Sequence, residues 1–584
     1  MRRHHLCVLA IGIGLGTITL AVPETRSSAI PAARARIEAR DDAPSPSPFQ
    51  HASWPLSRAE RTDYRETSRY QDVVAFLEAL ARLSDRVRVT DFGTTVEGRR
   101  LPLVILADPP IYQPSQAWAS GKLVVFIMAN IHAGEVEGKE ACLHLMRAIA
   151  LGRLRSLLDD LIILMAPIYN ADGNERISSR HRPRQKGPEG GVGVRFNAQG
   201  LDLNRDYMKL ESPEARALIG HIFNSWDPAL IVDLHTTNGS HHGYALTYAP
   251  SLNPNTHPAL IDYLRGQMLP AITRVMDERH HFKTYYYGNF IDPNDPSKGW
   301  RTFDHRPRFG NNYVGLRNRL TILSEAYAYN DFRTRIEATE RFVQSILEYS
   351  AAHAGEMRAL VQRADRETIA RGRSPQPSDR WGIRFRIKPL PHPVEILVPR
   401  MIAETDPTTG RTVSRRTGEI VTIRTLDYGL FEATETVRVP SAYLLLPDQR
   451  PIVDRVLAHG IAVEEIREPL SVDVEMFIIR RVIHDQRPFQ GHRQTHLEGR
   501  FQRGHVELPA GSFLIPMAQP KARLAFYLLE ARSDDGLVNW NAFDDYFATR
   551  ARTDGTIVYP VYRLMQPVRV ATRLIRSDSV HGER

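Results

Sequence analysis

Four apolar segments that alternate with helical patterns constrain the fold of this chain more than any other feature. They span residues 122–130 (KLVVFIMAN), 161–170, 229–237 and 320–329. Each is a continuous apolar run rather than an alternation of apolar and polar residues, which is typical of strands buried on both faces. Strands of this kind, alternating with helices, predict an α/β fold whose mixed, mostly parallel sheet is flanked by helices.

Helical spacing of apolar residues fills the intervals between these strands. It predicts helices over 69–84, 137–152 and 212–226, and one or two long helices over 334–371. Ser212 is a plausible N-cap with Pro213 at the first helical position. Beyond about residue 375 the pattern changes to short β-rich runs broken by Pro, Gly and Asp. We therefore expect a catalytic domain over 58–372 and a smaller β-rich C-terminal domain over 373–584.

The N-terminus resembles an export signal. A basic MRRHH start precedes an apolar, small-residue-rich stretch, so residues 1–22 are predicted to be a signal peptide, and the Pro/Ser/Arg-rich residues 23–57 a flexible leader. A membrane anchor is the alternative, but the run is short and Gly/Thr-rich for a stable span. The prediction is a secreted or periplasmic protein of bacterial type, with no stable membrane insertion after cleavage.

Length, charge and cysteine content exclude several other classes. A chain of 584 residues is too long for one compact core. Its net charge of +9 is diluted over that length, and no compact Lys/Arg tract with interleaved aromatics indicates nucleic-acid binding. Cys142 is the only cysteine outside the predicted signal peptide, so the mature chain forms no internal disulfide.

Polar residues that can do chemistry stand at the ends of the apolar strands. His132 and Glu135 follow the first strand, the NADGN turn (170–174) follows the second, and His235 and Glu325 lie near the ends of the other two. In open α/β sheets, ligand sites form outside the carboxyl ends of the strands. Segments about 100 residues apart are therefore expected to meet in one pocket.

Two imidazoles and one carboxylate form a ligand set of catalytic zinc, with a fourth position left for water. His132, Glu135 and His235 supply that set for one Zn²⁺ ion, and Glu325 is placed to deprotonate the activated water. Glu137 is the alternative to Glu135, but it is expected to open the following helix, where acids suit the helix dipole. Taken singly, a strand-end histidine is more often a structural residue, so the whole set carries the prediction.

The stretch GLDLNRDYMKLESPEA (200–215) completes a pattern. The order His132-x-x-Glu135, Asn170-Ala-Asp-Gly173, Asn204-Arg205, His235, Glu325 resembles the zinc metallocarboxypeptidases of the carboxypeptidase A type, over roughly residues 60–350. The resemblance implies that His132, Glu135 and His235 bind zinc. It also implies that Glu325 acts as general base and then as proton donor, and that Asn204 and Arg205 hold the terminal carboxylate of the substrate. A planar guanidinium suits that carboxylate geometry.

Two further roles of the family are less clearly matched. An arginine that polarises the scissile carbonyl is expected between the NADG turn and Asn204-Arg205, where Arg176, Arg180, Arg182 and Arg184 are available and Arg182 is preferred. The family's substrate-contacting tyrosine, some twenty residues before the base, has no counterpart here. Tyr313, which lies twelve residues before Glu325, and His305 are the candidates to replace that tyrosine. The third alternative is that the chain has no such group.

The predicted function is a zinc-dependent metallocarboxypeptidase that hydrolyses the C-terminal peptide bond through a metal-activated water and a glutamate base. Its partner is a peptide or protein with a free C-terminal carboxylate. A zinc-dependent amidase or N-acyl amino-acid deacylase on the same scaffold, acting for example on murein peptides, is the alternative, and an inactive binding protein is the third reading. No H-E-x-x-H, G-x-S-x-G or Walker A pattern occurs. Side-chain preference and oligomeric state do not follow from the sequence.

Overall fold

A computed structural model describes residues 54–405, 412–550 and 557–575, which belong to one compact unit. The predicted signal peptide (1–22) and all but the end of the predicted leader lie outside the described residues. Within the described ranges no helix is both long and apolar enough to cross a bilayer.

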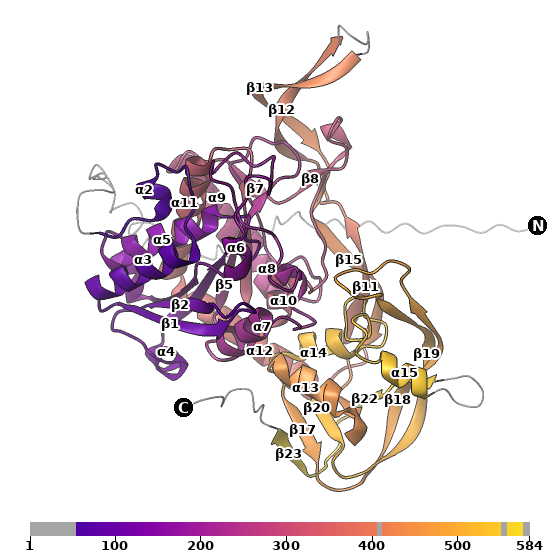
Figure 1. Cartoon of the computed structure of the whole chain (residues 1–584). Coiled ribbons are helices and arrows are strands. Elements are labelled where there is room, and N and C mark those ends of the chain that lie inside the picture. The colour runs from indigo at the N-terminus through magenta and orange to yellow at the C-terminus, as the bar shows by residue number, and fades with distance from the viewer. Residues whose placement is uncertain (1–53, 406–411, 551–556, 576–584) are drawn as a thin grey trace, which may run out of the picture. The chain divides into compact units, whose positions relative to one another are not determined.

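A mixed eight-stranded sheet forms the N-terminal half of this unit (Figure 1). In the order of the sheet its strands are β1 (Val87–Thr94), β2 (Arg100–Leu106), β4 (Leu161–Ala166), β3 (Leu123–Ala129), β5 (Leu230–Thr237), β10 (Leu320–Tyr327), β6 (Leu246–Ala249) and β7 (Thr284–Tyr286). Strands β4, β3, β5 and β10 are parallel neighbours. β1, β2 and β6 add antiparallel pairs toward the edges. The predicted fold class is confirmed.

Helices flank this sheet and connect its strands. They are α2 (Arg58–Arg61), α3 (Tyr70–Leu83), α4 (Pro114–Ser120), α5 (Glu137–Ala150), η1 (Arg155–Asp159), α6 (Ala171–Glu175), η2 (Leu203–Arg205), α7 (Pro213–Ala217), η3 (Leu218–Asn224), α8 (Pro258–Tyr263), η4 (Leu264–Met268), α9 (Leu269–Glu278), η5 (Pro296–Lys298), α10 (Gly310–Leu316), α11 (Phe332–Ala352) and α12 (Ala354–Arg373). The segment 334–371, expected as one or two helices, is two, which meet at His353.

Helix α5 packs closely on one face of the sheet because its second residue is glycine. A Cβ atom on Gly138 would lie 2.7 Å from Cβ of Leu234 in β5 and 3.3 Å from Cβ of Ala129 in β3. Helix α11 packs beside α5 and also contacts strands β10 and β6. The close approach matters for function because the loop just before α5 carries His132 and Glu135.

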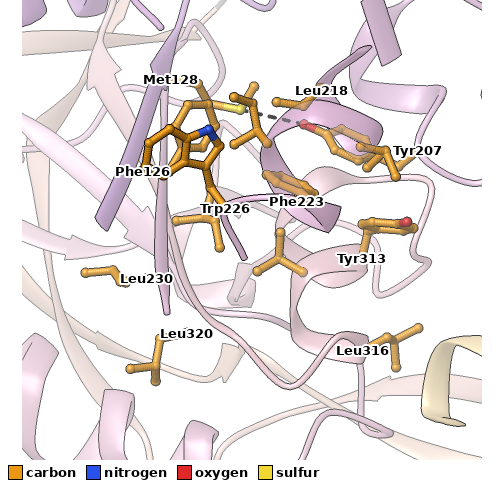
Figure 2. Close-up of a cluster of buried hydrophobic side chains, with 14 of the residues drawn as sticks. Phe126, Met128, Tyr207, Leu218, Phe223, Trp226, Leu230, Tyr313, Leu316 and Leu320 are labelled. Atoms are coloured by element: carbon orange, nitrogen blue, oxygen red, sulfur yellow. Dashed lines mark hydrogen bonds between the residues drawn. The ribbon is translucent and has the colours of Figure 1, made fainter. Parts of the chain in front are cut away.

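The opposite face of the sheet is covered by η3 and α10 through an aromatic cluster (Figure 2). Phe126 of β3 meets Phe223 of η3 edge to face at 6.2 Å, and Phe223 stacks on Tyr313 of α10 at 6.4 Å. The hydroxyl of Tyr207 points at the sulfur of Met128, 3.9 Å away. Offset and edge-to-face rings of this kind add to the stabilisation from burial alone.

The C-terminal part is β-rich, as predicted, with helices that the sequence pattern did not indicate. Its main sheet has the order β19-β18-β22-β16-β20-β17-β23, and β21 pairs with β18. The bounds are β16 (Ala442–Leu445), β17 (Val463–Ile466), β18 (Leu470–His484), β19 (Thr495–Leu508), β20 (Phe513–Pro516), β21 (Ile557–Val558), β22 (Val561–Leu564) and β23 (Thr572–Ile575), with η6 (Pro447–Gln449), α13 (Arg450–Ala458), α14 (Ala522–Leu529) and α15 (Asp544–Thr549).

Three smaller strand groups complete the structure, and the last of them joins the two parts of the chain. β11 (Arg380–Lys388) pairs with β15 (Leu430–Arg438), and β12 (Val394–Thr405) pairs with β13 (Thr412–Thr425). β14 (Asp427–Tyr428) pairs in parallel with β9 (Trp300–Arg301), which also pairs with β8 (Asn289–Phe290). One hydrophobic core runs through both parts. The division near residue 372 therefore stays a prediction.

We predict that Gly138→Ala destabilises the chain, because the new methyl group would overlap Leu234, and overpacking costs about 1–3 kcal/mol. The midpoint of urea unfolding should fall. Gly220→Ala is the matched control, since a Cβ there meets nothing within 4 Å. An unchanged midpoint for Gly138→Ala would show that α5 can move away from β5.

Candidate metal centre and substrate site

The carboxyl ends of the parallel strands β3, β5 and β10 carry the predicted site residues. His132 and Glu135 lie in the loop after β3, and His235 lies near the end of β5. Glu325 of β10 is the direct register partner of His235. Because adjacent strands lie about 5 Å apart and paired residues face the same side, the sheet brings these side chains to one place.

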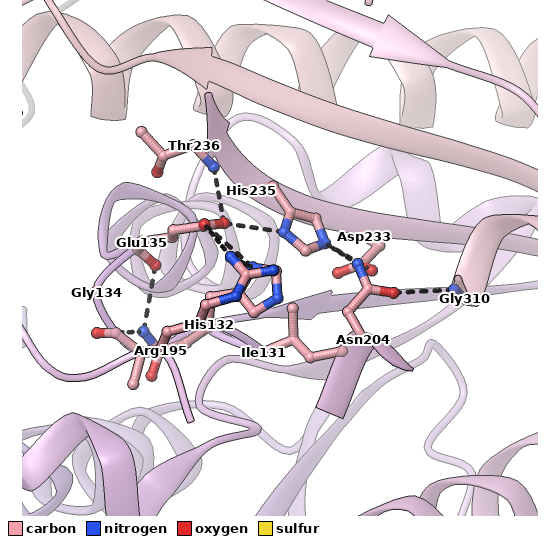
Figure 3. Close-up of polar contacts among 12 residues, drawn as sticks. Ile131, His132, Gly134, Glu135, Arg195, Asn204, Asp233, His235, Thr236 and Gly310 are labelled. Carbon is pink, nitrogen blue, oxygen red and sulfur yellow. Dashed lines mark hydrogen bonds and ion pairs between the residues drawn. The ribbon is translucent and has the colours of Figure 1, made fainter. Parts of the chain in front are cut away.

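His132, Glu135 and His235 form a compact buried cluster (Figure 3). Nδ1 of His132 lies 3.1 Å from Oε1 of Glu135, and Nδ1 of His235 lies 2.9 Å from Oε2 of the same carboxylate. One ligand atom from each residue falls within 4.8 Å of the others. Two imidazole nitrogens and one carboxylate thus lie close enough together to hold one ion.

Outer carboxylates orient both imidazoles. Oδ1 of Asp202 lies 3.0 Å from Nε2 of His132, and Oδ2 of Asp233 lies 2.9 Å from Nε2 of His235. Asp233 precedes His235 by two residues in β5, so both side chains leave the same face of the strand. A histidine that binds metal through one nitrogen usually donates from the other to such a partner. Each Nδ1 is therefore turned inward.

The charges of the cluster agree with that orientation. Burial opposes ionisation of Asp202, but His132 and Arg195 hold its pKa well below the usual range. Burial also opposes protonation of His235, but Asp233 and Glu135 raise its pKa well above the usual value. Asp202 is thus held ionised beside His132, and the charges around His235 favour a positive charge at that ring.

This donor set fits a zinc ion. Two neutral imidazoles with one carboxylate form a three-ligand catalytic set, and the inward Nδ1 atoms and the Glu135 oxygens are close enough together to share one ion. Among the described residues this is the one group of three or more His, Cys, Asp or Glu side chains close enough to hold a metal.

Glu325 lies half-buried beside the cluster. The strand register pairs it with His235, and its charge interacts with those of His235, Glu135 and Arg182. Burial raises the pKa of Glu325 to about 8, despite the opposing effect of His235. A carboxyl group that can exchange a proton near neutral pH is suited to acid–base work.

Arg182, the arginine preferred from the sequence, lies at the site but is fully engaged. It donates from one terminal nitrogen to Oε1 of Glu135 at 2.9 Å, from the other to the carbonyl of Thr236 at 2.8 Å, and from Nε to Gln185 at 2.7 Å. Its backbone has φ of +49°, and its side chain occupies the space that a Cβ on Gly134 would need. Arg182 therefore braces Glu135.

The other arginines of that loop lie away from the centre. Arg176 pairs with Glu97 at 2.6 Å, and Arg180 and Arg184 are exposed. In the described structure none of the three forms a hydrogen bond or ion pair with His132, Glu135 or His235.

Arg195 is a site residue that the sequence reasoning missed. Its Nε donates to Oδ2 of Asp202 at 2.9 Å, and its terminal NH1 lies 3.3 Å from Nδ1 of His132 (Figure 3). Its backbone carbonyl accepts from Nδ2 of Asn170, the first residue of the NADG turn. The available signal was its position seven residues before Asp202, just outside the quoted stretch.

Asn204 and Arg205 follow Asp202 on the short helix η2. Nδ2 of Asn204 lies 3.4 Å from Nε2 of His235, and its Oδ1 accepts from the backbone of Gly310 at 3.0 Å. The Arg205 guanidinium stacks on the ring of Phe309, 3.8 Å from the centroid. Burial lowers the pKa of Arg205, with Asp202 opposing. A half-buried guanidinium beside the cluster is a good carboxylate receptor.

Tyr313 does not reach the site. It is fully buried in the aromatic cluster under the sheet, and its hydroxyl lies 2.8 Å from Nδ1 of His459. Spacing along the chain suggested a substrate contact, but α10 turns this side chain into the core. His305, the other substitute, pairs with Asp534 at 2.9 Å.

Tyr287 is the tyrosine that the structure places near Glu325. It follows β7 and is partly exposed, and burial together with the nearby Glu325 charge raises its pKa to about 12. Its ring contacts Phe303 edge to face at 5.4 Å. It lies 38 residues before Glu325 in the chain, outside the window in which a tyrosine was sought.

Glu137 opens α5, as predicted, and also supports the site. Its carboxylate accepts from the hydroxyl of Thr236 and lies 3.4 Å from Nε of the buried Arg335. The backbone N–H of Thr236 in turn donates to Oε2 of Glu135 at 3.0 Å. Glu137 is thus one contact removed from the cluster.

Comparisons with known proteins show which proteins this chain resembles. Residues 73–291 match the model of the zinc carboxypeptidase family. Carboxypeptidase 2 of Trichophyton tonsurans is 24% identical over 507 residues, 81% of this chain and 84% of the fungal protein. Carboxypeptidase Z of Mus musculus is 29% identical over 154 residues, 24% of this chain and 22% of the mouse protein. A metallo-carboxypeptidase structure from Burkholderia cenocepacia aligns with a TM-score of 0.36 at 20% identity, covering 49% of this chain and 70% of that chain.

We predict that the chain binds one equivalent of zinc and that His132→Gln or His235→Gln loses most of it, because two remaining ligands hold the ion poorly. Bound metal is measured by mass spectrometry after dialysis. His241→Gln is the control, since His241 is a nearby half-buried histidine that stacks on Tyr329 and lies outside the cluster. Full zinc content in both ligand variants would place the metal elsewhere.

Proposed function

Because residues 73–291 of this chain match the model of the zinc carboxypeptidase family, we propose that it is a zinc-dependent carboxypeptidase that removes single residues from the C-terminus of peptides. The observation that carries this proposal is the close grouping of three donors from two strand ends, with a carboxyl group and a half-buried arginine beside them. The arrangement provides for attack on an amide and for recognition of a neighbouring carboxylate in one place.

His132, Glu135 and His235 are the proposed zinc ligands. Zinc, when bound, supplies a Lewis acid that polarises a carbonyl and lowers the pKa of a water molecule. Asp202 and Asp233 hold the two imidazoles in the orientation that such binding needs, by hydrogen bonds to their outer nitrogens.

Glu325 is the proposed proton carrier. It accepts a proton from the water as the new C–O bond forms, and it then delivers that proton to the nitrogen of the leaving amine as the amide C–N bond breaks. Its position opposite His235 in the register supports this role.

Arg195 is the proposed group that stabilises the negative charge on the carbonyl oxygen, in place of Arg182. Each guanidinium nitrogen of Arg182 donates to a protein group at 2.7–2.9 Å. In Arg195, Nε and NH2 hold Asp202, whereas NH1 makes the longer 3.3 Å contact with Nδ1 of His132, the atom that faces the centre of the cluster. A donor aimed at developing charge accelerates the reaction more than one that braces a ligand.

Asn204 and Arg205 are proposed to bind the terminal carboxylate of the substrate. This contact distinguishes a carboxypeptidase from an enzyme that cuts within a chain, because it requires a free C-terminus one residue from the reacting carbonyl. Tyr287, rather than Tyr313, is the tyrosine placed near the base.

Export through the signal peptide at 1–22, to the periplasm or beyond, remains part of the proposal, as does the catalytic segment 58–372. They rest on the sequence pattern alone. Measuring the N-terminus of the protein recovered outside the cytoplasm tests the cleavage, and an intact Met1 there would contradict it.

We predict that Glu325→Gln lowers kcat at least about a hundredfold, because the amide cannot accept the proton, while one zinc ion stays bound. Single-residue trimming of a peptide library, followed by mass spectrometry with and without a chelator, gives the rate and the class of cleavage. Glu337→Gln, on the exposed face of α11, is the control. Full turnover by Glu325→Gln, or internal cleavage by the wild type, would refute the mechanism or the class respectively.

We predict that Arg205→Gln raises KM for peptides with a free C-terminus roughly 10- to 100-fold, the effect of losing a charged hydrogen-bond partner. Arg205→Lys should recover only part of this loss, since an ammonium group cannot bind both oxygens in the plane. Equal KM values in wild type and Arg205→Gln would instead favour an amidase or deacylase that recognises a substrate group other than the C-terminal carboxylate.

A further inference from the structure

We infer that the C-terminal part of the chain belongs to the active site, because its β18–β19 turn, Phe489–His492, positions the receptor for the substrate's terminal carboxylate. The inference rests on the proposed role of Asn204 and Arg205. It assigns a function to a region to which neither the sequence pattern nor the proposed mechanism gives one.

The turn has a geometry that aims its side chains. Beyond the paired strands, Phe489 and His492 bond to each other through both backbone pairs, with N···O distances of 2.8 and 3.0 Å. The residues between them, Gln490 and Gly491, have φ of +51° and +82°. Two consecutive positive φ values define the tight type I′ hairpin turn, which favours Asn or Gly at both positions. A glutamine there is costly, which suggests that its side chain is needed.

The Gln490 side chain contacts the segment 202–211, which carries Asn204 and Arg205 and is called the anchor segment below. Oε1 of Gln490 accepts a hydrogen bond from the backbone N–H of Asp202 at 3.2 Å. At the other side of the turn, Nε2 of His492 pairs with Oε1 of Glu211 at 2.7 Å. Asn204 and Arg205 lie between these two contacts. The turn therefore holds the anchor segment at both ends.

The C-terminal part also holds residues 308–310, a second stretch of backbone that lies beside Asn204 and Arg205. Arg308 is buried, and it donates from its backbone N–H and from Nε to Asp535, at 2.7 and 2.9 Å. Its guanidinium lies over the rings of Phe489, at 5.0 Å, and Trp540, at 4.7 Å. A buried pair of this kind is rigid because breaking it would leave an uncompensated charge.

The two residues directly after Arg308 contact Arg205 and Asn204. Phe309 lies under the Arg205 guanidinium, and the backbone of Gly310 donates to Oδ1 of Asn204 (Figure 3). Asn204 and Arg205, the residues proposed to bind the substrate's carboxylate, belong to η2 and are also held from outside it by residues 308–310. Residues of the C-terminal part stabilise both the segment that contains η2 and residues 308–310.

This arrangement makes Gln490 and His492 positioning residues. They do not touch the metal ligands in the described structure, so their loss should weaken the carboxylate contact more than the chemical step. Gln490 does bond to Asp202, which orients His132, and zinc content must therefore be measured in each variant.

The test is a double-mutant cycle on the full chain with a peptide that has a free C-terminus. Gln490→Ala and His492→Ala are each expected to raise KM about fivefold to tenfold, the effect of one lost hydrogen bond, with kcat within twofold and one zinc retained. In an Arg205→Gln background the effect of Gln490→Ala should disappear, because coupled residues are not additive. Glu498→Ala, which removes an exposed ion pair with Arg481 in the same two strands, should match the wild type.

Amide hydrogen exchange gives a readout that does not depend on activity. Exchange in residues 203–211 should be faster in Gln490→Ala than in the wild type and unchanged in Glu498→Ala. An additive effect in the Arg205→Gln background, unchanged exchange, or a loss of zinc with unchanged KM would overturn the inference. A wild-type chain that trims no C-terminal residue would instead overturn the proposed function, while the exchange experiment would still decide whether the turn holds the segment.

Discussion

The buried carboxylate of Glu135 is the constraint on which the rest of the site depends. A charge removed from water is costly unless it is paired and hydrogen-bonded. Here His132 and Arg182 bind one oxygen, while His235 and the Thr236 N–H bind the other. These groups come from three segments that are far apart in the chain. The parallel strands of the sheet end at one edge, which brings these groups around a single carboxylate.

From that centre a network of hydrogen bonds extends outward to the partly exposed Arg195 and Gln490. Asp202 holds His132, Arg195 binds Asp202, and the backbone of Asp202 meets Gln490 of the C-terminal part. The β-rich part is therefore continuous with the catalytic part through hydrogen bonds as well as through the shared hydrophobic core. The boundary near residue 372 stays a prediction.

Patterns that depend on local physics were predicted well. The four apolar runs became β3, β4, β5 and β10, and the amphipathic segments became α3, α5, α11 and α12. The stretch from α8 to α9 was not assigned, and there a π-helical turn, η4, shifts the positions of buried residues away from the regular 3.6-residue spacing. The pairing of β6 and β7 with the sheet was also not foreseen, since strands of four and three residues give little periodic signal.

The amino-acid sequence by itself determined the class of fold, the strand-end placement of His132, Glu135, His235 and Glu325, and the likeness to zinc carboxypeptidases. Burial patterns and motif spacing are local or ordered along the chain, so they can be read without coordinates. Only the tertiary structure decided that Tyr313 lies in the core, that Arg195 points at the cluster while Arg182 braces Glu135, and that Gln490 meets Asp202 across 288 residues. The physical reason is that one exposed arginine, tyrosine or glutamine resembles another until packing selects its hydrogen-bond partner.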